Sequence, residues 1–199
     1  RSTLFPYTTL FRSRSNASGR KIYVPSESIG AYQAAEYWSS YANDILGIQS
    51  LTLNESTSNS TAIQNANGQM SEVTLSGRTL YKDGKWNTLC LPFNFSAEQI
   101  AAHADFAGAK LMELDTNGTN GFDATNGTLY LAFKEATAIK AGVPYLVKWD
   151  AAGTDVTSPV FFGVTINATA STTVSDYDDE LAEVQMKGCY SPVSVVADD

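Results

Sequence analysis

The sequence has few basic residues, few cysteines and almost no histidine. It holds 13 lysines and arginines against 21 acidic residues, together with two cysteines and one histidine. An acidic chain repels phosphate backbones, so we expect no nucleic-acid partner. A membrane-spanning helix needs about 20 apolar residues in succession, and no such run occurs, so we predict no transmembrane segment.

The scarcity of cysteine and histidine argues against metal and redox chemistry. Cys90, Cys189 and His103 show no spacing typical of a zinc site, and we predict no metal ligand and no cofactor. Cys90 stands in an apolar strand pattern, which favours a buried free thiol. A disulfide with Cys189 is the alternative, because spacing alone does not show whether two cysteines meet.

The first residues differ in character from the rest. Residues 1–13 resemble the translation of a sequencing-library adapter, so we set residues 1–15 aside as an artefactual or disordered leader. Without its three arginines, ten basic residues face 21 acidic ones. If this interpretation holds, the parent protein extends upstream, and Leu4, Phe5 and Phe11 pack against nothing substantial.

A strand followed by a helix is predicted next. Residues 20–25 form a short apolar strand that Pro25 ends, and Ser26 can cap a helix behind it. Apolar residues then recur at roughly helical spacing, at Ile29, Tyr32, Ala35 and Trp38.

The segment from Ile22 to Ile45 resembles the terminal unit of BspA-like leucine-rich-repeat proteins, which are surface proteins of Bacteroidetes-type bacteria. The resemblance lies in the order of the strand, Pro25, the tyrosine-bearing helix and Trp38. It implies that residues 16–47 cap a leucine-rich-repeat solenoid. The preceding repeats would carry much of the recognition surface.

Residues 48–72 are dominated by serine, threonine, asparagine and glutamine. A weak strand is predicted at Ile48–Leu53. The rest has too few apolar residues to offset the entropy of ordering it, so we predict a linker.

From residue 73 onward the pattern becomes that of β-strands. Short runs place apolar residues at alternate positions, so that each run presents one apolar face. These runs comprise Leu89, Leu91, Phe93 and Phe95; Leu129, Leu131 and Phe133; Val143, Tyr145, Val147 and Trp149; and Val160, Phe162, Val164 and Ile166. Ser96 and Gln99 form a capping box that predicts a short helix to about Ala102. The predicted fold is mainly β, an incomplete antiparallel β-sandwich-like module.

Two stretches of this region resemble a C-terminal module of Bacteroidetes surface proteins. They are residues 77–93, which include Trp86 and Cys90, and residues 138–148. The resemblance spans roughly residues 73–192 and implies that residues 73–199 form a module truncated at its C-terminus. No catalytic residues are associated with such modules.

Two acidic segments are candidate cation sites. Residues 115–123 place oxygen-bearing side chains at alternate positions, as a calcium loop does, but Asn120 stands where an EF-hand has glycine and Asn126 where it has glutamate. We therefore favour a polar hairpin loop. A second cluster, which includes Asp176, Asp178, Asp179 and Glu180, is interpreted as a solvated acidic loop.

Catalytic chemistry finds no support in the motifs. A Ser–His–Asp site would need His103, and no serine stands in a nucleophile-elbow context, so we expect this histidine at the surface. No pair of carboxylates is singled out for glycoside hydrolysis. We predict no catalytic residues.

Aromatic residues provide the best candidate for a ligand. Trp86 and Trp149, with Tyr81 and Tyr145, could form a platform for a sugar ring, although packing in the core is the alternative. The platform requires that Trp86 and Trp149 be coplanar and exposed to solvent.

Together these observations predict a non-catalytic, secreted or cell-surface protein with a structural or adhesive role. Its partner would be a host or bacterial surface protein or a glycan. A carbohydrate-binding module and an accessory domain of a surface glycoside hydrolase are the alternatives, and fold-level resemblance does not separate the three.

Overall fold

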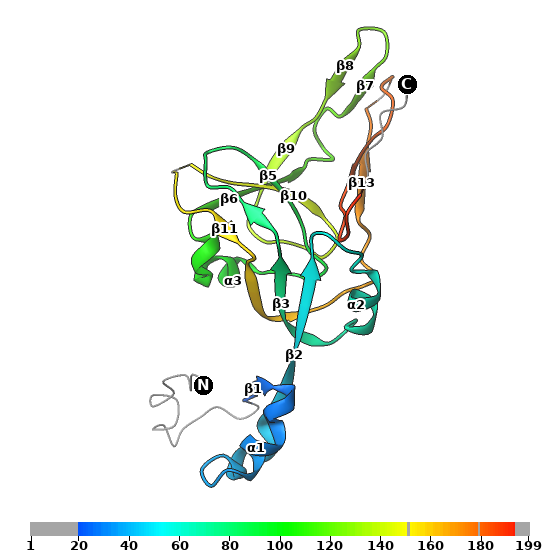
Figure 1. Cartoon of the computed structure of the whole chain (residues 1–199). Coiled ribbons are helices and arrows are strands. Elements are labelled where there is room, and N and C mark those ends of the chain that lie inside the picture. The colour runs from blue at the N-terminus through cyan, green and yellow to red at the C-terminus, as the bar shows by residue number, and fades with distance from the viewer. Residues whose placement is uncertain (1–19, 151, 179, 194–199) are drawn as a thin grey trace. The chain divides into compact units, whose positions relative to one another are not determined.

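The computed structural model describes residues 20–150, 152–178 and 180–193 (Figure 1). Strands make up 41% and helices 17% of the described residues, which confirms a mainly β fold. The chain divides into two compact units, residues 1–48 and 49–199. The leader predicted for residues 1–15 lies outside the described residues.

The first unit is a strand–helix–strand arrangement. Strand β1 (Ile22–Pro25) runs parallel to the first four residues of β2 (Ile45–Asn54), with Ile22 opposite Ile45. Helix α1 (Ile29–Ala34) lies between them in sequence, flanked by 3-10 turns at Ser26–Ser28 and Ser39–Asp44. Arg20 pairs with Asp44 at 2.9 Å, which ties the start of the unit to its last turn.

The helix of this unit is shorter than predicted. It ends at Ala34, because Ala35 is extended (φ −71°, ψ 140°). Ser26 begins the preceding 3-10 turn, and the residue that precedes the helix is Ser28, whose side chain makes no capping hydrogen bond. Trp38 still packs edge-on against Tyr32, with ring centroids 5.1 Å apart. A strand and a helix are therefore present, but nothing in the unit shows a leucine-rich-repeat solenoid.

The second unit contains several small sheets and short helices. Its elements in chain order after β2 are α2 (Ser60–Asn65), β3 (Met70–Ser76), β4 (Thr79–Leu80), β5 (Asn87–Cys90), α3 (Ala97–Ala102), a 3-10 turn (Ala104–Phe106), β6 (Ala109–Leu114), β7 (Gly121–Asp123), β8 (Thr128–Tyr130), β9 (Phe133–Ala136), β10 (Pro144–Trp149), β11 (Val156–Thr157), β12 (Val160–Thr165), β13 (Thr173–Asp176) and β14 (Val184–Lys187). One sheet has the antiparallel order β5-β10-β6-β9, and β3 pairs with β2 on one side and β12 on the other. The pairs β4–β11, β7–β8 and β13–β14 form separate two-stranded ribbons.

The segment that we predicted as a linker is ordered instead. Residues 49–54 of β2 run parallel to β3, with Leu51 opposite Val73. Two parallel strands need a crossover connection between them, and α2 lies in this connection. Ile63 and Ala66, within and directly after the helix, are buried. The prediction failed because those two residues, scattered among polar ones, give too weak an apolar pattern to reveal a short helix.

A single apolar core joins the strands of both sheets. Four aromatic residues form its centre, with Phe161 5.2 Å from both Phe93 and Phe95 and 5.5 Å from Phe106, measured between ring centroids. The predicted alternation of Leu89, Leu91, Phe93 and Phe95 is confirmed, since all four are buried. The predicted capping box is also present, and it begins helix α3.

Strand β12 departs from its predicted alternation. We expected Val160 and Phe162 to share a buried face with Val164, but both are exposed, and Phe161 is buried in their place. The register against β3 shifts between Phe161 and Val164, and Gly163 in this bulge has φ +69°. Because a bulge adds one residue to a strand, it reverses the phase of the alternation.

Candidate functional site

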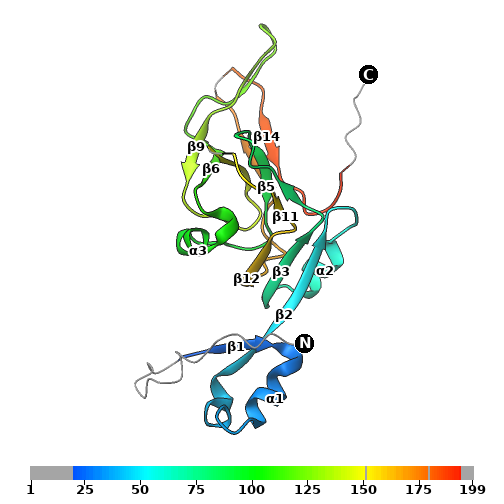
Figure 2. The same ribbon diagram turned by 60° about the vertical axis from the view of Figure 1, so that its left-hand side comes forward.

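One end of the second unit is built differently from the core, and we call it the tip. It consists of residues 115–133 and 171–186, which include the β7–β8 hairpin and most of the β13–β14 ribbon. Figures 1 and 2 show the hairpin extending beyond the sheets, with β13 on the same side of the unit. Neither ribbon belongs to the larger sheets, so other contacts must hold the tip in place.

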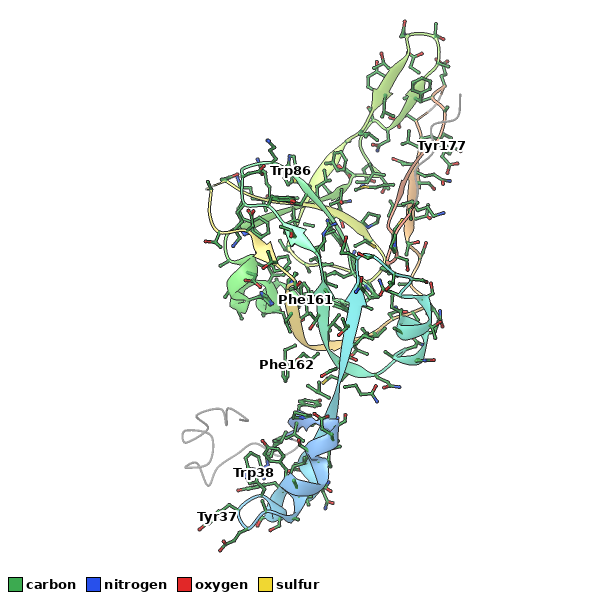
Figure 3. All side chains as sticks on the ribbon, in the orientation of Figure 1. Tyr37, Trp38, Trp86, Phe161, Phe162 and Tyr177 are labelled. Carbon is green, nitrogen blue, oxygen red and sulfur yellow. The ribbon has the colours of Figure 1, made fainter. Side chains whose placement is uncertain are left out.

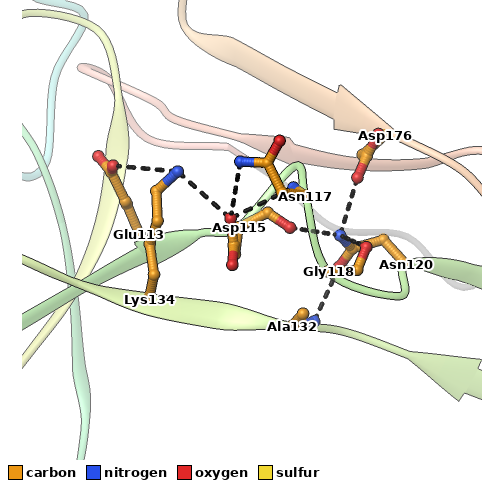
Figure 4. Close-up of polar contacts among 8 residues, drawn as sticks. All are labelled: Glu113, Asp115, Asn117, Gly118, Asn120, Ala132, Lys134 and Asp176. Carbon is orange, nitrogen blue, oxygen red and sulfur yellow. Dashed lines mark hydrogen bonds and ion pairs between the residues drawn. The ribbon is translucent and has the colours of Figure 1, made fainter.

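A buried asparagine organises the tip (Figure 4). The side chain of Asn120 is fully buried. Its amide nitrogen donates hydrogen bonds to the carbonyl oxygens of Asp115 (2.8 Å) and Gly118 (3.1 Å) and to the carboxylate of Asp176 (2.8 Å), while its Oδ1 accepts one from the Ala132 backbone (2.8 Å). One side chain thus connects the loop before β7, the connection between β8 and β9 and the end of β13.

The charged residues beside Asn120 are also paired. The Nζ atom of Lys134 lies 3.3 Å from the carboxylate of Asp115 and 3.8 Å from that of Glu113. A hydrogen bond from the Asn117 backbone, helped by Lys134, lowers the pKa of Asp115 below its ordinary value of 3.8. The carboxylate that would begin a calcium loop is therefore paired with the ammonium group of Lys134. The polar-loop interpretation of residues 115–123 fits this geometry.

Backbone pairing joins the hairpin to the segment between β13 and β14. Phe122 and Ala182 exchange two hydrogen bonds, of 2.9 and 3.0 Å. A Cβ atom on Gly121 would overlap the side chain of Leu181, and its φ of +138° also favours glycine. The amide of Asp178 donates to the carbonyl of Asn120 at 2.9 Å. The hairpin and the ribbon therefore form one assembly.

The tip exposes apolar side chains. Phe122 and Leu129 are direct cross-strand partners in the β7–β8 hairpin, and both are exposed, at 40% and 55%. Tyr130, Leu131 and Tyr177 are exposed as well, and Figure 3 shows Tyr177 toward the hairpin end of the unit. We predicted that Leu129, Leu131 and Phe133 share one apolar face of a strand, but the strand is interrupted between β8 and β9, and Leu129 and Leu131 are exposed.

Part of the acidic cluster that we predicted as a solvated loop is hydrogen-bonded to Asn120. Asp176 belongs to β13 and accepts a hydrogen bond from Asn120, and Asp178 donates its amide to the same residue. Glu180 is exposed with a positive φ of 73°, and Asp179 lies outside the described residues. Within the described ranges no three histidine, cysteine or acidic side chains are grouped to hold a metal ion.

A second buried asparagine fixes the other end of the ribbon. Asn59, just before α2, exchanges hydrogen bonds with the backbone of Asn54 (2.8 and 3.0 Å) and donates to the carbonyl of Tyr190. Its own amide donates to the hydroxyl of Ser191 at 2.9 Å. The segment after β14 is thereby held beside the body, and a cavity of about 540 Å³ lies between it, β5 and the ends of β2 and β3.

Both cysteines are free, as we preferred, and they line this cavity. The thiol of Cys90 donates to the carbonyl of Gly142 at 3.2 Å, and burial raises its pKa to about 12. Cys189 is exposed. The structure leaves the two thiols unbonded, although both line the same cavity.

The four-ring sugar platform is not formed. Trp149 and Tyr145 are buried in the core, at 4% and 0% exposure, so only Trp86 and Tyr81 reach the surface. Lys148 covers the Trp86 ring at 4.8 Å from its centroid. The side chain of Asn87 bonds both the amide and the carbonyl of Tyr81, at 2.8 and 2.9 Å, and so closes the loop that carries the two exposed rings.

His103, which we expected at the surface, is only partly exposed. Its side chain is 17% exposed and packs among Phe95, Phe106 and Phe161. Its Nδ1 atom accepts from the Asp105 amide (3.3 Å), and its Nε2 atom lies 2.8 Å from the Val160 carbonyl, so both nitrogens bond to backbone. This histidine holds the exposed edge of β12, and no serine takes part.

The sequence around Asn59 and Asn120 gives no sign that these residues are buried. Both occur in polar runs, and Asn120 precedes a glycine, which is the ordinary signature of an exposed turn. Their burial depends on segments about 55 to 130 positions away in the chain, namely Asp176 and Tyr190. No local pattern carries that information.

Comparison with known proteins finds no relative of this chain. No family model matches the chain, and neither the curated proteins nor the solved structures include a match. None of the described helices has the length and hydrophobicity of a membrane span. Function must therefore be argued from the residues of the tip and from the sequence resemblances.

Proposed function

We propose that this chain is a non-catalytic structural or adhesive part of a secreted or cell-surface protein, and that the tip is its contact surface. The observation that carries the proposal is the exposed apolar pair of Phe122 and Leu129 on a hairpin that Asn120 holds in a fixed position. Exposed apolar clusters mark interaction sites, and rigid presentation reduces the entropy cost of binding.

The sequence resemblances support the location and the role. Residues 22–45 resemble the end of BspA-like leucine-rich-repeat proteins, and residues 73–192 resemble a module of bacterial surface proteins. The partner would then be a protein or glycan on a host or bacterial surface. In such an arrangement the β-rich unit would connect the recognition repeats to the cell envelope or space them from it.

A carbohydrate-binding module is the second candidate, and it rests on a different surface. Trp86 and Tyr81 are exposed at the two ends of a loop that Asn87 closes. Aromatic rings of this kind can stack on sugar rings. Only two of the four predicted rings are available to a sugar, and Lys148 covers one of them, so the aromatic surface is smaller than the sequence predicted.

Binding to immobilised surface molecules separates the two candidates. The chain would be passed over purified fibronectin, collagen, mucin and soluble polysaccharides, with biolayer interferometry as the readout. The adhesive proposal expects binding to a protein that the Phe122→Ser/Leu129→Ser variant loses and the Trp86→Ala/Tyr81→Ala variant keeps. The opposite pattern on polysaccharides would favour the carbohydrate-binding module. Binding that neither variant changes would contradict both.

A further inference from the structure

The charge of the molecule is concentrated at the tip. Residues 115–133 and 171–186 contain seven of the 21 acidic residues and none of the 13 basic ones, although Lys134 and Lys187 directly follow the two ranges and Lys134 pairs with Asp115. The rest of the chain then carries 14 acidic and 13 basic residues and is almost neutral. A region of one sign on an otherwise balanced protein attracts partners of the opposite sign and repels its own kind.

These charges are held in defined positions around the apolar pair. Asp123 follows Phe122 in β7, and its carboxylate accepts hydrogen bonds from Thr125 (2.8 Å) and Asn126 (2.7 and 3.1 Å). The side chain of Asn126 chiefly lowers the pKa of Asp123, so this residue stays ionised. Glu183 is exposed and follows Ala182, the backbone partner of Phe122. Negative charge therefore borders the apolar pair along both neighbouring segments.

We infer that the tip binds a cationic polypeptide segment whose apolar side chains cover Phe122 and Leu129. This inference rests on the proposed function of the tip as a contact surface. An apolar centre with a charged rim is the usual anatomy of a protein interface, in which the rim selects the partner and the centre supplies affinity. A second copy of the chain fits poorly, since two anionic tips would repel each other.

The backbone indicates the shape of the partner. Strand β8 pairs with β7 on one side, and within the described residues no strand pairs with its other side. An extended segment can add to such an edge through backbone hydrogen bonds, while its side chains alternate between the two faces. A segment with alternating basic and apolar residues would meet both the acidic rim and the apolar pair.

Fluorescence anisotropy with defined peptides tests this inference. The probe is a short labelled peptide of alternating lysine and valine, and the comparison peptides replace lysine with glutamate or valine with serine. We expect only the lysine–valine peptide to bind the whole chain, with about tenfold weaker affinity at high than at low ionic strength. Equal binding of all three peptides, or no binding of the lysine–valine peptide, would overturn the inference.

Two pairs of variants locate the binding. Glu180→Lys/Glu183→Lys should weaken binding of the lysine–valine peptide by about tenfold or more, whereas Glu27→Lys/Glu36→Lys makes the same charge change at exposed sites of the first unit and should have little effect. Phe122→Ser/Leu129→Ser should abolish binding, whereas Val160→Ser/Phe162→Ser removes exposed apolar groups of β12 and should not. Equal effects within either pair would place the peptide elsewhere.

The outcomes also separate this inference from the proposed function. If Phe122→Ser/Leu129→Ser abolishes binding to a surface protein but the charge variants do not matter, the tip is a contact surface and the cationic partner is wrong. If the peptide binds at the tip but no surface protein does, the adhesive role fails instead. Sedimentation velocity showing a dimer that the apolar variant dissociates would assign the surface to a second copy and overturn the inference.

Discussion

The core and the tip of the second unit are stabilised by different interactions. In the core, Phe161 and its neighbours are removed from water and contact several apolar side chains at once. At the tip, the largest apolar residues are exposed, and a single buried amide connects three segments. Apolar packing is non-directional, whereas a hydrogen-bonded network depends on the angles and distances between its members. The tip can therefore leave its apolar side chains free for a partner.

Removal of a central core ring should have the largest effect. Phe161→Ala is expected to lower the free energy of unfolding by about 3–5 kcal/mol, because it leaves a cavity among buried aromatic rings. The neighbouring Phe162→Ala should change it by less than about 0.5 kcal/mol, since this ring is 59% exposed. Urea unfolding of both variants makes the comparison. Similar losses would contradict the bulge in β12.

Removal of the amide network should have the next largest effect. Asn120→Ala leaves the Ala132 amide without its partner and removes the hydrogen bonds that the buried side chain donates to Asp115, Gly118 and Asp176, at a cost of about 2–4 kcal/mol. Asn117→Ala, an exposed position in the same loop, is the matched control. Thermal unfolding compares the two. An equal effect of both substitutions would show that Asn120 is not the organising residue.

Acidification should weaken the tip before the core. The pKa values of Asp115 and Asp123 are lowered in the folded state by hydrogen bonds, chiefly from Asn117 and Asn126 respectively. Their contribution to stability is complete above the ordinary value of 3.8 and is lost as the pH falls through the lowered values. Carboxyl NMR titration should give midpoints below 3.8 for both residues. Midpoints at or above this ordinary value would contradict the hydrogen bonds of the two carboxylates.

The two thiols should differ in reactivity without any change in stability. Cys189 is exposed, whereas burial raises the pKa of Cys90 to about 12, so that almost no thiolate is present near neutral pH. A thiol-specific colorimetric reagent at about pH 8, near the ordinary pKa of a thiol, should react quickly with one cysteine and slowly with the other. The Cys189→Ser variant should lose the fast phase. Two equal rates, or no free thiol, would contradict the arrangement beside Gly142.

Sequence patterns predicted the core far better than the tip. The alternation of Leu89 to Phe95 and the capping box at Ser96 depend on near neighbours, and the structure confirms both. The bulge at Gly163 was missed, because one added residue reverses the phase of an alternating pattern.

The tip could not be predicted for a different reason. The buried side chain of Asn120 bonds to Asp176, which is 56 positions away. The exposure of Leu129 depends on whether a second layer covers the hairpin, and its own strand carries no sign of that. Alternation shows which residues share a face, but not what lies against that face.

Amide hydrogen exchange tests most directly whether Asn120 holds the tip independently of the core, since it reports on both regions in one experiment. We predict that the amides of Ala132 and Phe122 are protected in the native chain, but less than that of Val147 in the core. In Asn120→Ala the first two should lose their protection while Val147 keeps its own. If all three amides instead exchange together in both proteins, the tip and the core form one cooperative unit, and Asn120 does not hold the tip separately.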